Sequence, residues 1–169
     1  MSDGTGGDGL ERIWAPHRMA YVRSAVDDEG CPFCAIPGHP DGESLVVARG
    51  GSTYAVLNLH PYNPGHLMVL PYRHVADLAD LTLEESGELM SMTQQALRTI
   101  RAVSRPDAFN VGLNLGRSAG GSLADHLHQH VVPRWTGDAN FITVVGGAKI
   151  LPQLLEDTRD LLAAAWADA

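Results

Sequence analysis

Short runs rich in β-branched and aliphatic residues recur between residues 44 and 133, with Gly, Pro or Asn between them. Such runs are typical of β-strands bounded by turns. The pattern predicts five strands, at residues 44–48, 53–59, 66–71, 109–115 and 125–133. Arg49-Gly50-Gly51 separates the first two runs and indicates a hairpin.

A longer apolar stripe follows the third predicted strand. Its residues recur at steps of three and four: Leu89, Met92, Ala96, Ile100 and Val103. This spacing predicts an amphipathic helix with one face on the core. Thr82 and Glu85 have the spacing of a capping box, so the helix should begin there, and Pro106 should end it. A second helix is expected over 152–166, with Pro152 near its first turn.

Short turns between neighbouring strands favour antiparallel pairing. We therefore expect the α+β class: a five-stranded, mostly antiparallel sheet, one long helix between the third and fourth strands, and a C-terminal helix. The chain has 169 residues, and a single domain is expected over 10–169. Residues 1–9 are rich in Gly and Asp and predict a disordered tail. Residues 10–25 weakly indicate a helix, and 30–42 indicate a loop because of their Gly and Pro content.

The net charge of −8 argues against non-specific binding to nucleic acid, which needs a basic surface. Small anionic ligands are still possible, because backbone N–H groups can bind phosphate in an acidic protein. No apolar run approaches the roughly 18 residues of a membrane helix, so no membrane partner is expected. Cys31 and Cys34 are too few for a disulfide scaffold, and we expect a cytoplasmic protein.

Three histidines, His126, His128 and His130, occupy alternate positions in the last predicted strand. Alternate side chains of a strand share one face, so these imidazoles should lie side by side. Such a row can bind a metal, as in three-histidine zinc sites, or attack phosphorus as a nucleophile. A surface strand that is rich in histidine by chance is the alternative, and the Gly/Ser-rich loop 116–122 beside the row argues against it.

The segment 126–132, His-Leu-His-Gln-His-Val-Val, resembles the motif of the histidine triad superfamily of nucleotide hydrolases and transferases. The likeness extends over about 44–135. Segment 58–71 is similar to the family's nucleoside-binding strand pair, and 114–122 resembles its phosphate loop. The resemblance implies the HIT-like fold and a two-fold homodimer. Gln129 departs from the motif, which usually has an apolar residue there, and we expect it to face water or a subunit interface.

Segments 46–50, 130–135 and 137–141 are similar to the actinobacterial branch that phosphorolyses diadenosine tetraphosphate. This resemblance implies an enzyme that acts on an adenine dinucleoside polyphosphate and orthophosphate through a nucleotidyl-histidine intermediate, giving ADP and ATP. With water as acceptor, it would be a hydrolase of dinucleoside polyphosphates or nucleoside phosphoramidates. Two other classes are a nucleotide-binding or sensing protein with little turnover, and a zinc hydrolase that uses all three histidines.

The resemblance also implies roles for individual residues. His128 would be the nucleophile, with its other ring nitrogen held by a backbone carbonyl, and His130 would donate hydrogen bonds to phosphate. Asn58 would hold the ribose hydroxyls. The remaining substrate-binding residues are Asn114, Gly120, Gly121 and Ser122 around the phosphates, and His66 near the site. Glycines suit such a loop because they permit close backbone approach. A purely structural histidine is an equally good interpretation of His66.

Cys31-x-x-Cys34 is a possible half of a zinc site, since zinc in structural sites takes four ligands. The resemblance implies His74 and His126 as the other two, in a structural zinc site with no organic cofactor. His39 is a competing fourth ligand because Cys34-x4-His39 is also a plausible spacing. A reduced, buried thiol pair is the alternative. If His126 binds zinc it cannot also contact phosphate, and the metal would instead hold the strand that presents His128.

Overall fold

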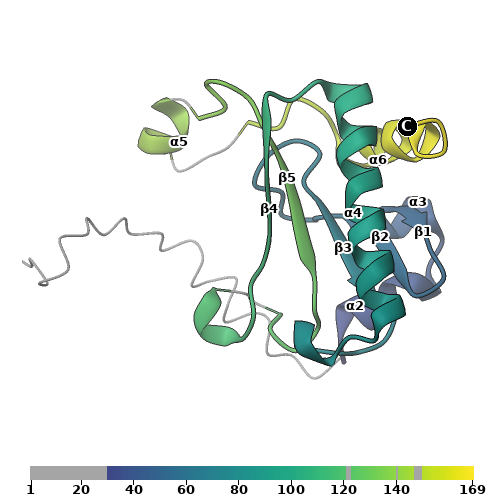
Figure 1. The fold of residues 1–169 in the computed structure, drawn as a ribbon. Coiled ribbons are helices and arrows are strands. Elements are labelled where there is room, and N and C mark those ends of the chain that lie inside the picture. Colours follow the sequence, from purple (N-terminus) through teal and green to yellow (C-terminus); the bar gives the residue numbers. More distant parts are fainter. Residues whose placement is uncertain (1–29, 121–122, 140, 147–149) are drawn as a thin grey trace, which may run out of the picture.

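A computed structural model describes residues 30–120, 123–139, 141–146 and 150–169, so the tail expected at 1–9 and the weak helix at 10–25 lie outside the described residues. Its five strands form one sheet in the order β1-β2-β3-β5-β4, and every neighbouring pair is antiparallel (Figure 1). The strands are β1 (Val46–Arg49), β2 (Thr53–Leu57), β3 (Leu67–Pro71), β4 (Ala108–Leu113) and β5 (Gln129–Arg134). The predicted α+β class and antiparallel sheet are confirmed.

The last strand is shorter than predicted. β5 begins at Gln129, so His126 and His128 lie in the extended segment that leads into it. Here the chain finds hydrogen-bond partners outside the sheet. The N–H of Leu127 donates to the carbonyl of Val75 at 2.6 Å, and the carbonyl of His126 bonds to a side chain. The N–H of Leu127 is therefore not available for pairing with β3, and the last pair between β3 and β5 is Val69 and Gln129.

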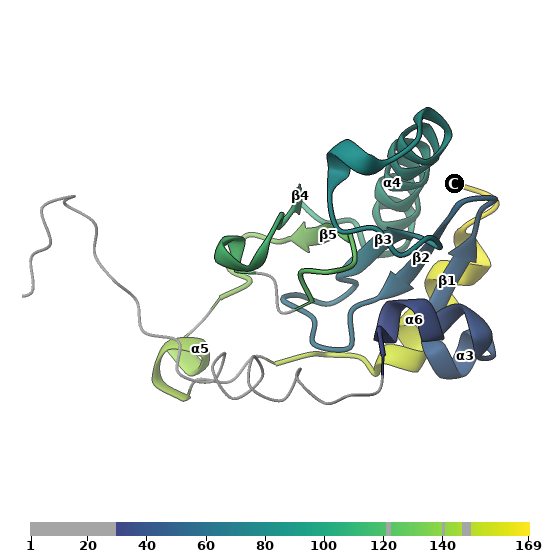
Figure 2. The same ribbon diagram turned by 90° about the horizontal axis from the view of Figure 1, so that it is seen from below.

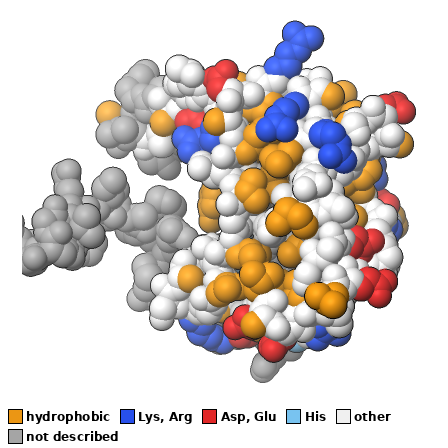
Figure 3. Space-filling model, in the orientation of Figure 1, with side chains coloured by type: hydrophobic (Ala, Val, Ile, Leu, Met, Phe, Trp, Pro, Cys, Tyr) orange, Lys and Arg blue, Asp and Glu red, His pale blue; other side chains and the backbone are white. Residues whose placement is uncertain are grey.

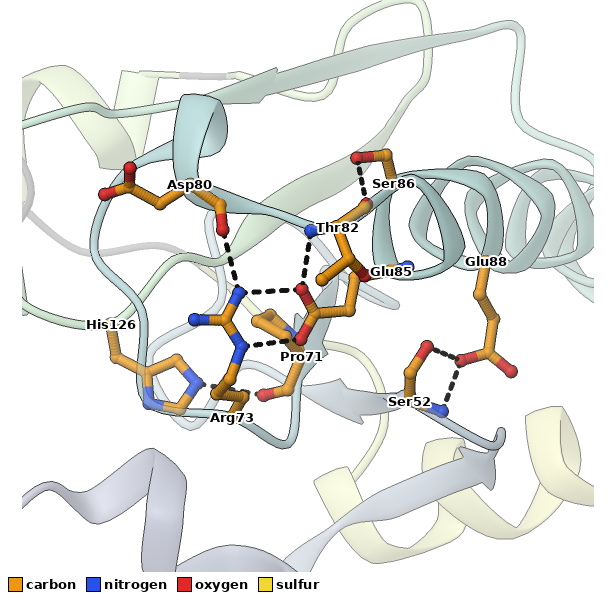
Figure 4. Close-up of polar contacts among 9 residues, drawn as sticks. All are labelled: Ser52, Pro71, Arg73, Asp80, Thr82, Glu85, Ser86, Glu88 and His126. Atoms are coloured by element: carbon orange, nitrogen blue, oxygen red, sulfur yellow. Dashed lines mark hydrogen bonds and ion pairs between the residues drawn. The ribbon is translucent and has the colours of Figure 1, made fainter.

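Helix α4 (Leu83–Ser104) lies across one face of the sheet (Figures 1 and 2). The predicted capping box is present: the Thr82 hydroxyl accepts from the N–H of Glu85, and the Glu85 carboxylate accepts from the N–H of Thr82 (Figure 4). The helix ends before Arg105, which adopts the left-handed conformation, and Pro106 follows. The predicted stripe is its buried face, formed by Leu89, Met92, Ala96 and Ile100, with Val103 partly buried.

The rest of the described chain is helical or irregular. The segment expected as a loop at 30–42 is instead mostly short helices, namely α2 (Pro32–Ala35), η1 (Ile36–Gly38) and α3 (Asp41–Ser44). Pro32 starts α2 because proline has no N–H to leave unpaired at a first helical position. The structure also has η2 (Leu78–Asp80), η3 (Arg117–Ala119) and α5 (Phe141–Gly146), which was not predicted.

The C-terminal helix, α6 (Leu155–Ala165), begins after Pro152 and packs at the β1 edge of the sheet (Figure 2). Leu162 of this helix joins the hydrophobic core that the strands share with α4. No helix in the described part of the chain is long and apolar enough to cross a membrane.

The contact of Gln129 shows which face of β5 packs against α4. Gln129 is buried, and its Nε2 donates to the Thr93 hydroxyl of α4 at 2.6 Å. The expectation that it faces water is therefore wrong, because α4 supplies the partner that a buried amide needs. Since strand side chains alternate, His130 and Arg134 point to the face of the sheet opposite α4. The face of β5 that carries His130 is thus the face that does not pack against α4.

Helix α4 is tied to the β1–β2 turn by Glu88. Its carboxylate accepts hydrogen bonds from the N–H and the hydroxyl of Ser52 (Figure 4). It also accepts from the N–H of Gly51 and the hydroxyl of Thr53. A Cβ atom at Gly50 would lie 2.5 Å from Glu88 Oε1, so a side chain there would displace the Glu88 carboxylate. Burial would raise the pKa of Glu88, but these hydrogen bonds outweigh it and lower the pKa to about 2.

We predict that Glu88→Gln lowers the free energy of unfolding at pH 7 by about 1–2 kcal/mol, because an amide accepts fewer of these bonds. A folded-state pKa of about 2 against an ordinary 4.5 stabilises the protein above pH 4.5, and this contribution is lost as pH falls toward 2. The difference between wild type and variant should therefore shrink over that range in urea unfolding. Glu84→Gln, at an exposed position of the same helix, is the control, and a pH-independent difference contradicts the prediction.

Candidate active site

His128 is buried, and its two ring nitrogens have different surroundings. Its Nδ1 lies 2.8 Å from the carbonyl oxygen of His126. A carbonyl can only accept, so Nδ1 carries the proton and donates. Burial lowers the pKa of His128 below its ordinary value, although the same hydrogen bond opposes that shift. In the neutral ring, Nε2 therefore holds a lone pair, which is the state that a nucleophile requires.

His130 has the opposite arrangement, and His66 imposes it. The N–H of Tyr62 donates to Nδ1 of His66 at 3.1 Å, so the proton of this neutral ring lies on Nε2. That Nε2 lies 2.9 Å from Nδ1 of His130, which must then accept. His130 consequently carries its own proton on Nε2. The structure thus gives His66 contacts both to the backbone and to a histidine of the row, combining its structural and functional interpretations.

The charge states support these tautomers. His66 is fully buried, and burial followed by the neighbouring His130 and His128 lowers its pKa to about 3. Burial and His128 lower the pKa of His130 to about 4. Both rings are therefore neutral at pH 7. The centroids of the His128 and His130 rings lie 5.0 Å apart, so one unprotonated and one protonated Nε2 belong to adjacent rings.

His126 belongs to a different group of side chains. Its Nε2 lies 3.0 Å from the carbonyl oxygen of Pro71 and donates to it (Figure 4), which leaves the lone pair on Nδ1. That Nδ1 lies 3.3 Å from Sγ of Cys31 and 3.5 Å from Sγ of Cys34. His74 completes the group, with its Nδ1 3.3 Å from Sγ of Cys34.

One ligand atom from each of Cys31, Cys34, His74 and His126 lies within 4.8 Å of the other three, so the cluster can hold a metal ion. Both cysteines are free thiols. The hydrogen bond from Nε2 of His126 to the carbonyl of Pro71 fixes the orientation of the ring. Metal-binding histidines commonly donate their other ring N–H to an acceptor in this way. The structure therefore assembles the four residues that the sequence pointed to, and the competing His39 is exposed and not part of the group.

Phe33 joins this cluster to the histidine row, a contact that sequence reasoning missed. Its buried ring lies between two histidines, with centroids 5.6 Å from His126 and 5.1 Å from His128. Its carbonyl accepts a hydrogen bond from the buried hydroxyl of Tyr54 at 2.7 Å. The only available sequence signal was its place between Cys31 and Cys34, which says nothing about the packing partner.

The face of the sheet opposite α4 has a cavity of about 440 Å³ beside His130. Asn114, predicted to contact phosphate, lines it together with residues of β4 and β5. Asn58 is half-buried at the end of β2, where its Oδ1 accepts from the N–H of His60. Gly120 follows η3 in the left-handed conformation, with a φ of 92° that favours glycine. The predicted Gly121 and Ser122 lie outside the described residues.

Comparisons with known proteins identify the family of the chain. A family model described as the HIT domain matches residues 40–137. The chain is 62% identical over 168 residues to an AP-4-A phosphorylase of Mycobacterium tuberculosis, covering 95% of this chain and 86% of that relative. It is 40% identical over 91 residues to a bis(5'-adenosyl)-triphosphatase of Saccharomyces cerevisiae, covering 53% of this chain and 44% of the relative.

Among solved structures, a Zn-bound histidine triad family protein from Mycobacterium smegmatis superposes with a TM-score of 0.67 at 28% sequence identity. The match covers 82% of this chain and 94% of that one. The fold is therefore shared with a protein whose crystal structure contains zinc.

Proposed function

The chain belongs to the HIT domain family, and from that premise we propose that it is a nucleotidyltransferase that phosphorolyses diadenosine tetraphosphate to ADP and ATP. The observation that carries this proposal is the pair of fixed tautomers, a lone pair on Nε2 of His128 beside a proton on Nε2 of His130. The high identity to an AP-4-A phosphorylase supports the choice of substrate and acceptor.

In the first step, Nε2 of His128 attacks the α-phosphorus of one adenylate. An N–P bond forms as the bond from phosphorus to the bridging oxygen breaks, and that oxygen leaves as part of ATP. Positive charge that develops on the His128 ring is held by the carbonyl of His126, which accepts from Nδ1 at 2.8 Å. The proton on Nε2 of His130 is available to the oxygen on which negative charge builds.

In the second step, an oxygen of orthophosphate attacks the same phosphorus. The N–P bond breaks, ADP forms, and the electron pair returns to Nε2 of His128. The ring tautomer does not change over the cycle, because Nδ1 keeps its proton throughout. His66 is a positioning residue in this scheme, since it holds His130 in the donor tautomer.

The other substrate contacts are proposed from the positions of polar groups. Asn58 would bind ribose hydroxyls at the end of β2, and Asn114 would contact phosphate oxygens beside His130. The backbone N–H groups beyond Gly120, at Gly121 and Ser122, would bind the phosphates. The N–H of Gly120 itself donates to the carbonyl of Arg117 at 3.2 Å, so its part would be to let the loop turn.

Hydrolysis is the second candidate, and it differs only in the acceptor. The similarity to a bis(5'-adenosyl)-triphosphatase favours it, although the chain matches less than half of that relative. Water attacking the nucleotidyl-histidine would give AMP in place of ADP. The arrangement of His128 and His130 serves both reactions equally.

We also propose that Cys31, Cys34, His74 and His126 hold a structural zinc. Two sulfur and two nitrogen atoms suit the tetrahedral geometry that zinc adopts in closed sites. When bound, the metal would supply cross-linking between α2, the segment after β3 and the segment before β5. Phe33 would then be held against His128. Thiolate ligands require reduced cysteines, which agrees with the cytoplasmic location we propose.

A homodimer is proposed from the exposed edge of the sheet. β4 has a partner on one side only, and the side chains of most of its residues are exposed. Edge strands of this kind can pair with another chain. Figure 3 shows apolar side chains gathered on the side of the molecule that Figure 1 presents. Val111 of β4 and Leu83 and Met90 of α4 are exposed apolar side chains.

Incubation with diadenosine tetraphosphate and orthophosphate should give equimolar ADP and ATP, measured by anion-exchange chromatography. Radiolabel from orthophosphate should appear in the ADP, because its phosphorus becomes the β-phosphate. AMP and ATP formed without orthophosphate would show hydrolysis instead.

His128→Ala should lower kcat by at least about 1,000-fold, since it removes the nucleophile. His39→Ala, at an exposed histidine outside the site, is the matched control and should retain full activity. Full activity of His128→Ala would reject the nucleotidyl-histidine mechanism.

Elemental analysis should find about one zinc per chain. Cys31→Ser should lose most of it, while His39→Ala keeps it. Removal of the metal by a chelator should lower the free energy of unfolding by at least about 2 kcal/mol. An unchanged unfolding transition in the metal-free protein would contradict a structural role.

Sedimentation equilibrium should give twice the chain mass of 18.1 kDa. Val111→Glu should shift the protein toward monomer, because a charge on the edge strand opposes pairing. Leu161→Glu, at an exposed position of α6, serves as the control. A wild-type protein that sediments as a monomer would overturn the dimer.

A further inference from the structure

The cavity beside His130 forms a groove that lies over β4 and β5, on the face of the sheet opposite α4. It is lined by Tyr62, Asn110, Gly112, Asn114, His130 and Arg134, among others. His130 and Arg134 share a face of β5 and are four residues apart, which corresponds to about 13 Å of strand. The volume of about 440 Å³ is within the range of roughly 300–1,000 Å³ found for small-molecule sites.

The sheet order determines which part of the substrate reaches this groove. Asn58, the proposed ribose contact, lies at the end of β2, and β3 and β5 separate it from β4. A nucleoside held at Asn58 with its α-phosphorus at His128 leaves only the side toward β4 for the rest of the molecule. In an in-line displacement, the leaving group departs on the side opposite the nucleophile. His130, which would face the leaving oxygen in the proposed reaction, also lines the groove.

We propose that this groove binds the leaving nucleotide, a nucleoside triphosphate when the substrate is diadenosine tetraphosphate. The proposal rests on the proposed function and deepens it by assigning a second nucleotide subsite. After the first step, an attacking orthophosphate must approach the nucleotidyl-histidine from the same side. The groove is therefore also the entry path of the acceptor once the triphosphate has left.

Gly112 keeps the groove open next to the reacting atoms. It pairs with His130 across the β4–β5 ladder, so a side chain there would stand on the same face as the imidazole. A Cβ atom at Gly112 would meet nothing within 4 Å. Its φ is not positive, so the strand conformation would accept other residues, and branched ones favour strands. The missing side chain is required neither by the backbone nor by packing, and its absence leaves room for a ligand.

Hydrogen-bond donors continue along the groove away from His130. In the β4–β5 register, Gly112 pairs with His130 and Asn110 pairs with Val132, so Asn110 lies on the side of Gly112 that leads to Arg134. Asn114 lies on the other side of Gly112, toward His128. The guanidinium donates from Nε and Nη2 to Asp138 and from Nη1 to Oδ1 of Asn110. These bonds use three of its five N–H groups, so two remain for a ligand. Asp138 orients this arginine and offsets its charge, so the subsite offers directed donors rather than a strongly positive surface.

The test is to narrow the groove and compare two substrates. Gly112→Ala and Gly112→Val should lower kcat/KM for diadenosine tetraphosphate progressively, by about tenfold or more for valine. Adenosine 5'-phosphofluoridate has the same adenylate but releases only fluoride, so its kcat/KM should stay within about twofold of wild type. Leu161→Thr, at an exposed position of α6 outside the groove, should leave both values unchanged.

Equal losses on both substrates would mean that the added side chain disturbs His130, and no loss on either would mean that the groove is empty during turnover. Both results overturn the subsite. If the wild type cleaves neither substrate, the proposed function fails, and the groove is then judged by binding alone. Titration with ATP should shift the side-chain amide signals of Asn110 in NMR spectra, and Gly112→Val should abolish the shift. Unperturbed Asn110 signals in the wild type would overturn the groove as a nucleotide site.

Discussion

The chemistry of this site depends on how each buried imidazole is hydrogen-bonded. A neutral histidine has one donor and one acceptor nitrogen, and the protein decides which is which by occupying one of them. Carbonyl oxygens occupy Nε2 of His126 and Nδ1 of His128, whereas His66 occupies Nδ1 of His130. Three histidines of one motif thus present different ring nitrogens, which suits the proposed roles of metal ligand, nucleophile and proton donor. Identical side chains obtain different roles from the partner on their far side.

Burial keeps each imidazole neutral and so preserves these tautomers. Desolvation lowers the pKa of each ring, so none gains a second proton that would erase the distinction at neutral pH. Buried polar groups need hydrogen-bond partners, and the carbonyls of His126, before β5, and Pro71, at the end of β3, supply two of them. The ring of Phe33 packs against both His126 and His128. It therefore joins the four-residue cluster of Cys31, Cys34, His74 and His126 to the proposed nucleophile by direct contact. Stability and reactivity are therefore set by the same contacts.

The sheet keeps packing and catalysis on opposite faces. Gln129 bonds to Thr93 of α4 on the covered face, while His130 stands on the open one beside Gly112. Glu88 and Glu85 tie the helix to neighbouring segments, and hydrogen bonds lower both carboxyl pKa values to about 2. Because these contacts hold α4 on the covered face, the fold tolerates unfilled space on the open face. The groove over β4 and β5 lies on this open face.

The sequence by itself determined the elements whose signal is local. The capping box at Thr82, the stripe from Leu89 to Ile100, the strand pattern and the alternating histidines each depend on spacing along one segment, and the resemblance to a known family added the partners of Cys31 and Cys34. Only the tertiary structure decided the rest. The tautomers depend on Pro71, Tyr62 and His66, and the burial of Gln129 depends on Thr93, which is 36 residues away. The spacing of residues within one segment reveals its helical or strand periodicity. It does not reveal which residue of a distant segment will be the hydrogen-bond partner. The short helices from Pro32 to Ser44 were missed for the same reason, because Gly and Pro indicate turns without indicating what those turns pack against.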